Sequence, residues 1–164
     1  MKTNFLKSIS AALIAGMFIF SGCTKEETAE PIQTSNKEAT GDNLRQIQVY
    51  PLMSVSDPSV SGSVSFQKAG PNTKVTIILE GTMPDGDHPA HIHFNSVAEG
   101  GGIAVSLNNV NGASGRSTTI VNMMDNGTTI TYEDLLNFDG HVNVHVSPTN
   151  LATLIAQGDI GSNF

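Results

Sequence analysis

The chain has a single cysteine and no tryptophan, and only 5% of its residues are aromatic. One cysteine excludes an internal disulfide, so a folded domain must be held together by packing or with help from a bound metal. With no Trp and two Tyr, an aromatic platform for stacking sugars or bases is not expected. The length of 164 residues leaves room for one domain once the ends are removed.

Basic residues are also scarce. From Leu44 to the C-terminus the chain holds four of them against ten acidic residues, which gives a formal charge of −6. A surface this acidic, without a basic stripe, argues against nucleic acid and anionic lipid as ligands. A metal ion or a cationic partner suits it better, although an acidic surface also simply keeps a domain soluble.

The only long apolar run lies at the N-terminus. Lys2 and Lys7 form a charged region before the apolar residues 9–20, a segment too short to span a bilayer. Residues 1–22 are therefore predicted to be a signal peptide. The sequence F-S-G-C, which ends at Cys23, resembles the lipobox of bacterial lipoproteins. This resemblance implies that Cys23 becomes the lipidated first residue of the mature chain. The alternative is an ordinary signal peptide or a single anchor helix.

Residues 23–43 are predicted to be a flexible tether. Beyond Cys23 they are rich in Thr, Glu, Ser and Asn and contain one large aliphatic residue, Ile32, so they cannot bury enough apolar area to fold. The K-E-E sequence directly after Cys23 resembles the acidic signals that send some Gram-negative lipoproteins to the cell surface. We therefore expect a folded domain, residues 44–164, that is lipid-anchored at the outer membrane or cell surface.

Within the predicted domain, apolar and polar residues alternate and turn residues interrupt the alternation at short intervals. This pattern predicts strands near residues 46–55, 62–67, 74–79, 90–94, 103–107, 116–122 and 141–146. Seven or eight strands at this spacing predict an all-β fold, an antiparallel β-sandwich or flattened barrel. Pro51 inside the first strand is typical of an edge strand.

Two short helical segments are predicted between the strands. Thr131 and Asp134 have the spacing of a helix N-cap with its capping box. Residues 149–157, closed by Gly158, form the second candidate. The apolar residues of this segment recur at helical spacing: Leu151, Leu154 and Ile155.

All five histidines fall in two of the strand regions, H-P-A-H-I-H (88–93) and H-V-N-V-H (141–145). Residues two apart on a strand share a face, so each strand is predicted to bury its aliphatic side chains, Ile92 and Val144 among them. The opposite face then carries His91 and His93 in the first strand, and His141, Asn143 and His145 in the second. Side by side, two such strands form a nitrogen-rich patch that can hold zinc or copper. The alternative is two ordinary strands whose outward residues happen to be His.

Several of these segments together resemble a CHRD domain, the module first described in chordin. They are A-H-I-H with the following A-E-G-G-G-I, the L-L pair of the first helical segment, V-N-V-H, and the closing G-D-I-G. The resemblance covers roughly residues 55–164. CHRD domains in turn resemble copper/zinc superoxide dismutases, because the order of G-S-V-S-F, H-x-x-H-x-H, V-H and G-D-I-G is the same. The resemblance implies a Greek-key, dismutase-like fold.

Carried over residue by residue, the resemblance implies a copper site made of His91, His93 and His145, with His88 as a structural histidine. The match ends there. Residues 95–140 contain no His, the dismutase cysteine pair is absent, and no Arg follows Arg116 to guide superoxide. A bridged dinuclear site is therefore excluded.

These observations predict a lipid-anchored binding or accessory module of the cell envelope, with one copper or zinc ion and no catalytic residue. His141 lies roughly 13–14 Å from His145 along an ideal strand, which places it outside the ligand set, at the surface or as a supporting donor beside Asn143 and His88. Its partners would be the metal ion and an unidentified extracellular protein, with no nucleic acid. The alternatives are a divergent copper dismutase-like redox protein and a metal-free structural envelope domain.

Overall fold

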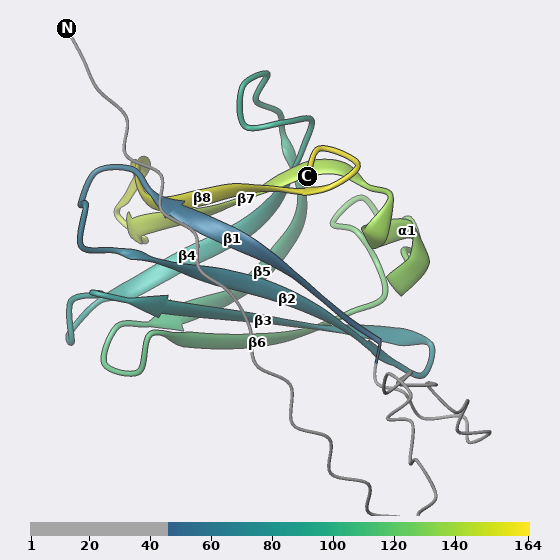
Figure 1. Cartoon of the computed structure of the whole chain (residues 1–164), viewed down its shortest axis with the longest axis horizontal. Coiled ribbons are helices and arrows are strands. Elements are labelled where there is room, and N and C mark those ends of the chain that lie inside the picture. The colour runs from purple at the N-terminus through teal and green to yellow at the C-terminus, as the bar shows by residue number, and fades with distance from the viewer. Residues whose placement is uncertain (1–45) are drawn as a thin grey trace, which may run out of the picture. The chain divides into compact units, whose positions relative to one another are not determined.

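The structure, a computed structural model, describes residues 46–164. These residues form eight strands and one short helix (Figure 1). In chain order the elements are β1 (Ile47–Ser54), β2 (Ser61–Ala69), β3 (Asn72–Glu80), β4 (Asp87–Phe94), β5 (Ile103–Asn111), β6 (Arg116–Val121), α1 (Tyr132–Leu136), β7 (Asp139–Ser147) and β8 (Asn150–Gly161). The predicted signal peptide, Cys23 and tether lie outside the described residues. Within 46–164, no helix combines the length and the apolar character needed to cross a membrane.

The strands pair antiparallel throughout and close into a barrel in the order β1-β2-β3-β6-β5-β4-β7-β8 (Figure 1). β3 neighbours β6 and β4 neighbours β7, so two connections cross the barrel ends in Greek-key fashion. Two seams are thin: β5 and β6 share one residue pair, and β1 and β8 share two. The seams divide the barrel into two four-stranded sheets, which confirms the predicted all-β flattened barrel.

Strict alternation along the strands builds the core. In β3, Thr73, Val75, Ile77 and Leu79 are buried, while the residues between them are half-buried. Ile92 of β4 and Val144 of β7 are fully buried, as predicted, and so are several other large side chains: Phe66, Leu52, Ile77, Ile130, Leu135 and Ile160. The buried side chains are therefore mostly apolar, and the buried polar ones are few: Thr73, His88, Ser117, His141 and His145.

The first predicted helix is confirmed as α1. The Thr131 hydroxyl accepts a hydrogen bond from the backbone N–H of Asp134, and the Asp134 carboxylate accepts one from the backbone N–H of Thr131. This reciprocal pair satisfies two donors that the first helical turn would otherwise leave free. Leu135 is fully buried against the barrel, and Glu133 forms an ion pair with Lys68 of β2.

The second predicted helix is wrong, because residues 149–157 belong to β8. Ser147 pairs with Asn150, whereas His145 pairs with Leu154, so bulges shift the register between β7 and β8. Extra residues in a bulge break the period of two and create an apolar spacing that resembles that of a helix. Gly158 does not end a helix; a Cβ there would overlap the Pro51 carbonyl oxygen, so glycine lets β1 and β8 approach.

The prediction that Pro51 marks an edge strand is also wrong, because the barrel is closed. β1 pairs with β2 through Pro51, opposite Ser63, but its pairing with β8 involves only Met53 and Ser54. The proline therefore lies at a seam where β1 has a ladder on one side only. A missing N–H costs little at such a position.

Candidate metal centre

Strands β4 and β7 lie side by side in the barrel wall and together carry all five histidines. Their register places His91 opposite Asn143 and His93 opposite His141. The aliphatic residues of both strands are buried inside the barrel: Ala90, Ile92, Val142 and Val144. The imidazoles of the alternate positions consequently stand on the outer face of the β5-β4-β7-β8 sheet, as the alternation predicts.

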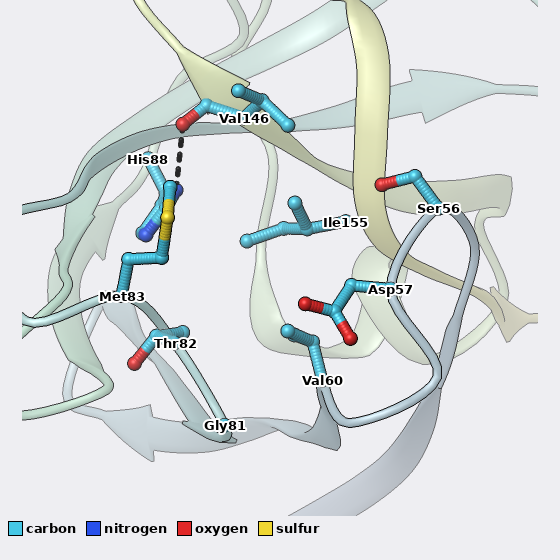
Figure 2. A pocket seen from close by; sticks show the side chains of 9 residues that line it. All are labelled: Ser56, Asp57, Val60, Gly81, Thr82, Met83, His88, Val146 and Ile155. Atoms are coloured by element: carbon cyan, nitrogen blue, oxygen red, sulfur yellow. Dashed lines mark hydrogen bonds between the residues drawn. The ribbon is translucent and has the colours of Figure 1, made fainter.

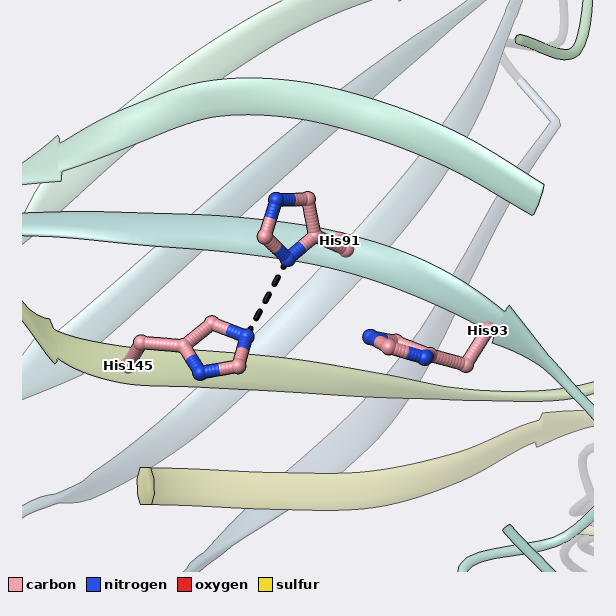
Figure 3. A group of neighbouring side chains, drawn as sticks. All are labelled: His91, His93 and His145. Carbon is pink, nitrogen blue, oxygen red and sulfur yellow. Dashed lines mark hydrogen bonds between the residues drawn. The ribbon is translucent and has the colours of Figure 1, made fainter. Parts of the chain in front are cut away.

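Three of these imidazoles converge. One ring nitrogen from each of His91, His93 and His145 lies within 4.8 Å of the other two (Figure 3). Such nitrogens all lie within about 2.8 Å of a common point, compared with the roughly 2.0–2.1 Å of a nitrogen bound to zinc. The separation of His91 Nδ1 and His145 Nε2 is 3.1 Å. Two nitrogens bound to one tetrahedral ion would be roughly 3.3 Å apart. The three histidines therefore lie close enough to hold a metal ion.

Backbone carbonyls determine which nitrogen of two imidazoles carries the lone pair. Nδ1 of His93 donates to the Gly101 carbonyl oxygen at 2.9 Å, and Nδ1 of His145 donates to that of Leu151 at 2.7 Å. Each neutral ring must then carry a lone pair on Nε2. His93 Nε2 is buried and has no hydrogen-bond partner. A buried imidazole nitrogen with an unpaired lone pair, close to nitrogens of two other imidazoles, is the kind of ligand that zinc or copper binds.

His91 differs, because its Nδ1 faces His145 and donates a hydrogen bond to the lone pair on His145 Nε2 at 3.1 Å (Figure 3). As a metal ligand through Nδ1, this ring would carry its proton on Nε2. Asp125 supplies a negative charge near His91 that acts to raise the pKa of the imidazole. The carboxylate is held by the backbone N–H (2.9 Å) and the hydroxyl (2.7 Å) of Ser106, which is the β5 residue opposite His91.

Loss of solvent favours the neutral form of all three imidazoles. Loss of solvent lowers the pKa of His91, His93 and His145 below the ordinary value, and it is the largest cause in each case. Repulsion from the neighbouring imidazoles lowers the pKa of His91 and His93 further. Only the neutral imidazole has a lone pair to give a metal, so the environment favours the form that binds metal.

The same shifts predict how the metal-free domain responds to acid. A histidine with a lowered folded-state pKa binds fewer protons folded than unfolded once the pH falls below about 6.5. Above this pH the histidines therefore cost the folded domain no stability. As the pH drops toward their lowered folded-state pKa values, the free energy of unfolding decreases. Thermal unfolding with chelator between pH 7.5 and 5 should show a decreasing Tm, less steeply in His93→Gln. An equal slope in both proteins would contradict this account of burial.

A short loop after β4 supplies two of the fixing carbonyls. Asn95 adopts a positive φ of 64°, a conformation that Asn tolerates better than most residues, and its carbonyl oxygen accepts a hydrogen bond from Nδ1 of His141 at 2.7 Å. A Cβ at Gly101 would overlap the Phe94 carbonyl oxygen, so only glycine brings this backbone beside His93. The Asp159 carboxylate ties the loop to β8 through the N–H of Val97 at 2.6 Å. The loop thus orients His93 and His141 before any ligand arrives.

His141 stands beside the three convergent histidines and is not one of them. It is 3% exposed, so it does not occupy a surface position. Its ring stacks on His93 with centroids 5.1 Å apart, and its Nε2 accepts a hydrogen bond from Nδ2 of Asn143 at 3.3 Å. His141 therefore packs against one of the convergent imidazoles and is itself fixed at both nitrogens.

His88 lies near the start of β4, whereas His91 and His93 lie toward its end. Its Nδ1 donates to the carbonyl oxygens of Val146 (2.8 Å) and His145 (3.2 Å), which holds the β7 backbone at His145. The ring also forms one wall of a pocket of about 180 Å³ (Figure 2). The rest of this pocket is lined by Ser56, Asp57, Val60, Gly81, Thr82, Met83, Val146 and Ile155. His88 thus contacts the backbone of the candidate site without joining it.

Sequence reasoning missed the backbone acceptors at Asn95, Gly101 and Leu151 and the Ser106–Asp125 contact. A carbonyl group carries no residue-type signal, so these partners had to come from the fold. One signal was present: three consecutive glycines follow the H-x-H strand within ten residues. Such a run is typical of a close backbone approach.

Comparison with known proteins gives no assignment, since no protein-family model and no curated protein matches this chain. The resemblance to CHRD domains therefore stays a hypothesis.

Proposed function

We propose that this chain is a lipid-anchored CHRD-type protein of the cell envelope that binds one copper or zinc ion through His91, His93 and His145. The supporting observation is the convergence of one nitrogen from each ring, together with the buried, unpaired Nε2 of His93. A random surface group of histidines would turn its nitrogens toward water. Here backbone carbonyls accept from the far nitrogens of His93 and His145, so both near nitrogens carry lone pairs; that of His93 has no partner, and that of His145 faces His91 Nδ1 at 3.1 Å.

The choice between metals follows from the donors. Three imidazoles suit zinc and copper, whereas calcium and magnesium require oxygen ligands. A zinc ion would supply Lewis acidity and a copper ion one-electron chemistry. Three protein ligands leave a further coordination position free for an external molecule, as in catalytic rather than structural zinc sites. The domain's formal charge of −6 also favours a cation over an anionic ligand.

We infer a binding or accessory role rather than superoxide dismutation. The sequence lacks a bridging histidine between residues 95 and 140 and an Arg after Arg116, and its acidic surface repels the superoxide anion. The dismutase alternative makes a different prediction, because it requires fast, copper-dependent loss of superoxide. The metal-free alternative requires that no metal binds at all.

The test is metal analysis of protein purified without chelator or affinity tag, followed by calorimetric titration with Cu²⁺ and Zn²⁺. We expect one ion per chain and little superoxide loss. At a free metal concentration one hundred times Kd, binding to the folded state alone should add about 2.7 kcal/mol of stability. Absence of binding would favour the metal-free structural domain, and rapid superoxide loss would favour the dismutase alternative.

The membrane attachment has its own test. Cys23→Ser should move the full-length protein from the membrane to the soluble fraction, because Cys23 is the only cysteine available for lipid. Fractionation followed by immunoblotting measures this, with Thr34→Ala in the tether as a control that should stay in the membrane fraction. A Cys23→Ser protein that remains in the membrane with its signal segment uncleaved would show a helical anchor instead.

A further inference from the structure

Asn143 lies at the centre of the histidine cluster. Along β7 its neighbours on the same face are His141 and His145, two residues away in each direction. Across the ladder His91 is directly opposite, and His93 is diagonal because it pairs with His141. The Asn143 amide is therefore surrounded on its own strand and on the β4 side by four imidazoles, and it forms part of the surface on which they stand.

The hydrogen bonds of His141 determine how this amide is turned. Since Nδ1 of His141 donates to the Asn95 carbonyl oxygen, Nε2 has only a lone pair and needs a donor. Nδ2 of Asn143 is that donor, at 3.3 Å. The amide oxygen lies on the other edge of the planar group, so Oδ1 is directed away from His141.

Oδ1 of Asn143 is buried and has no hydrogen-bond partner. Within residues 46–164 only four buried side-chain polar atoms lack a partner, and two of them, Asn143 Oδ1 and His93 Nε2, belong to this one cluster. Both are acceptors. Buried acceptors are rarely left unpaired, because the cost of removing them from water is then not recovered. A cation bound to the imidazoles would satisfy His93 and would still leave the amide oxygen without a donor.

We infer that Asn143 Oδ1 accepts a hydrogen bond from a small ligand that occupies the coordination position left free by His91, His93 and His145. This inference rests on the proposed metal site. A ligand with an O–H or N–H group, water above all, satisfies the oxygen. An aprotic anion leaves Oδ1 unpaired and brings negative charge toward the negative end of the amide dipole. Asn143 thus selects protic ligands over aprotic anions.

Azide, an aprotic anion that binds Cu²⁺, tests this selection. The protein is loaded with Cu²⁺, its copper content is measured, and azide is then titrated while the azide-to-copper charge-transfer absorption is recorded. Asn143→Leu removes the acceptor oxygen at nearly constant side-chain volume. This variant should bind azide at least about tenfold more tightly than the wild type, because bound azide then leaves no buried oxygen without a hydrogen-bond donor. Asn143→Asp keeps an acceptor oxygen and should bind azide no more tightly than the wild type.

Gln157 provides a matched control, because this amide lies opposite Asn143 on β8, on the side away from β4. Gln157→Met should leave azide affinity unchanged.

Equal azide affinity in the wild type and Asn143→Leu would overturn the inference. So would a loss of copper from Asn143→Leu as complete as that from His93→Ala, since Asn143 would then be a ligand itself. If Asn143→Leu does not fold, Asn143→Val carries the same test. A wild type without copper would overturn the proposed metal site as well, and the copper measurement would show this before azide is added.

Discussion

Replacing either His93 or His145 with Ala is expected to weaken Cu²⁺ or Zn²⁺ binding by more than about a hundredfold, the upper end of what the loss of a supporting contact costs. Each change removes one of three nitrogens that converge within 4.8 Å, and two imidazoles from unconnected positions form a much weaker site. Calorimetric titration of each variant measures the effect.

His141→Ala is the matched control, because this imidazole belongs to the same patch and stacks on His93 but is not one of the three convergent rings. Its loss should weaken binding by about tenfold or less. Equal affinities in all the histidine variants would show that the patch is structural. His145 is buried, so its Ala variant needs a separate check of folding. Circular dichroism and thermal unfolding of each metal-free variant separate loss of the fold from loss of the ligand.

Val144→Asp is expected to unfold the domain. Val144 is completely buried on β7 and lies between Ala90 of β4 and Ala156 of β8 in the sheet, both also completely buried. A carboxylate there has no cation or hydrogen-bond donor to compensate for its loss of water. The cost of burying an unpaired charge exceeds about 4 kcal/mol, against a total stability of roughly 5–15 kcal/mol for a domain. Loss of the cooperative unfolding transition measures the effect.

Val49→Asp is a control with the same residue and the same substitution on the outer face of the barrel. Val49 is 50% exposed on β1, so its replacement should change stability by about 0.5 kcal/mol or less. A soluble, cooperatively folded Val144→Asp protein would mean that the faces of β7 are reversed. In that case the imidazoles would point into the barrel rather than onto its outer wall.

Local patterns in the sequence determined much of the fold. The period of two along β4 and β7 separates Ile92 and Val144 from the histidines, because alternation of side chains is a property of the extended backbone itself. The capping box of α1 depends on Thr131 and Asp134, three residues apart, so it too could be predicted locally. The same alternation predicted that the imidazoles of the two strands share an outer face, before the pairing of the strands was known.

Where local patterns conflicted with long-range pairing, the prediction from local patterns was wrong. The apolar spacing of Leu151, Leu154 and Ile155 favours a helix, but bulged pairing with β7 makes this segment a strand. Pro51 is typical of an edge, and only closure of the barrel turned that edge into a seam. Strand pairing joins residues far apart in the chain, and its energy is absent from any local window.

The candidate site divides in the same way. The sequence alone determined which residue types can bind a metal, and alternation determined the face of each strand on which they stand. Only the tertiary structure decided that His145 of β7 approaches His91 of the neighbouring strand β4. It also decided that His141 stacks on His93 and lies outside the group of three. The tertiary structure likewise decided which nitrogen of His93, His145 and His141 carries the lone pair, because the carbonyl oxygens of Gly101, Leu151 and Asn95 accept from the other nitrogen of each ring. Every residue carries the same carbonyl, so only the path of the backbone determines where one lies.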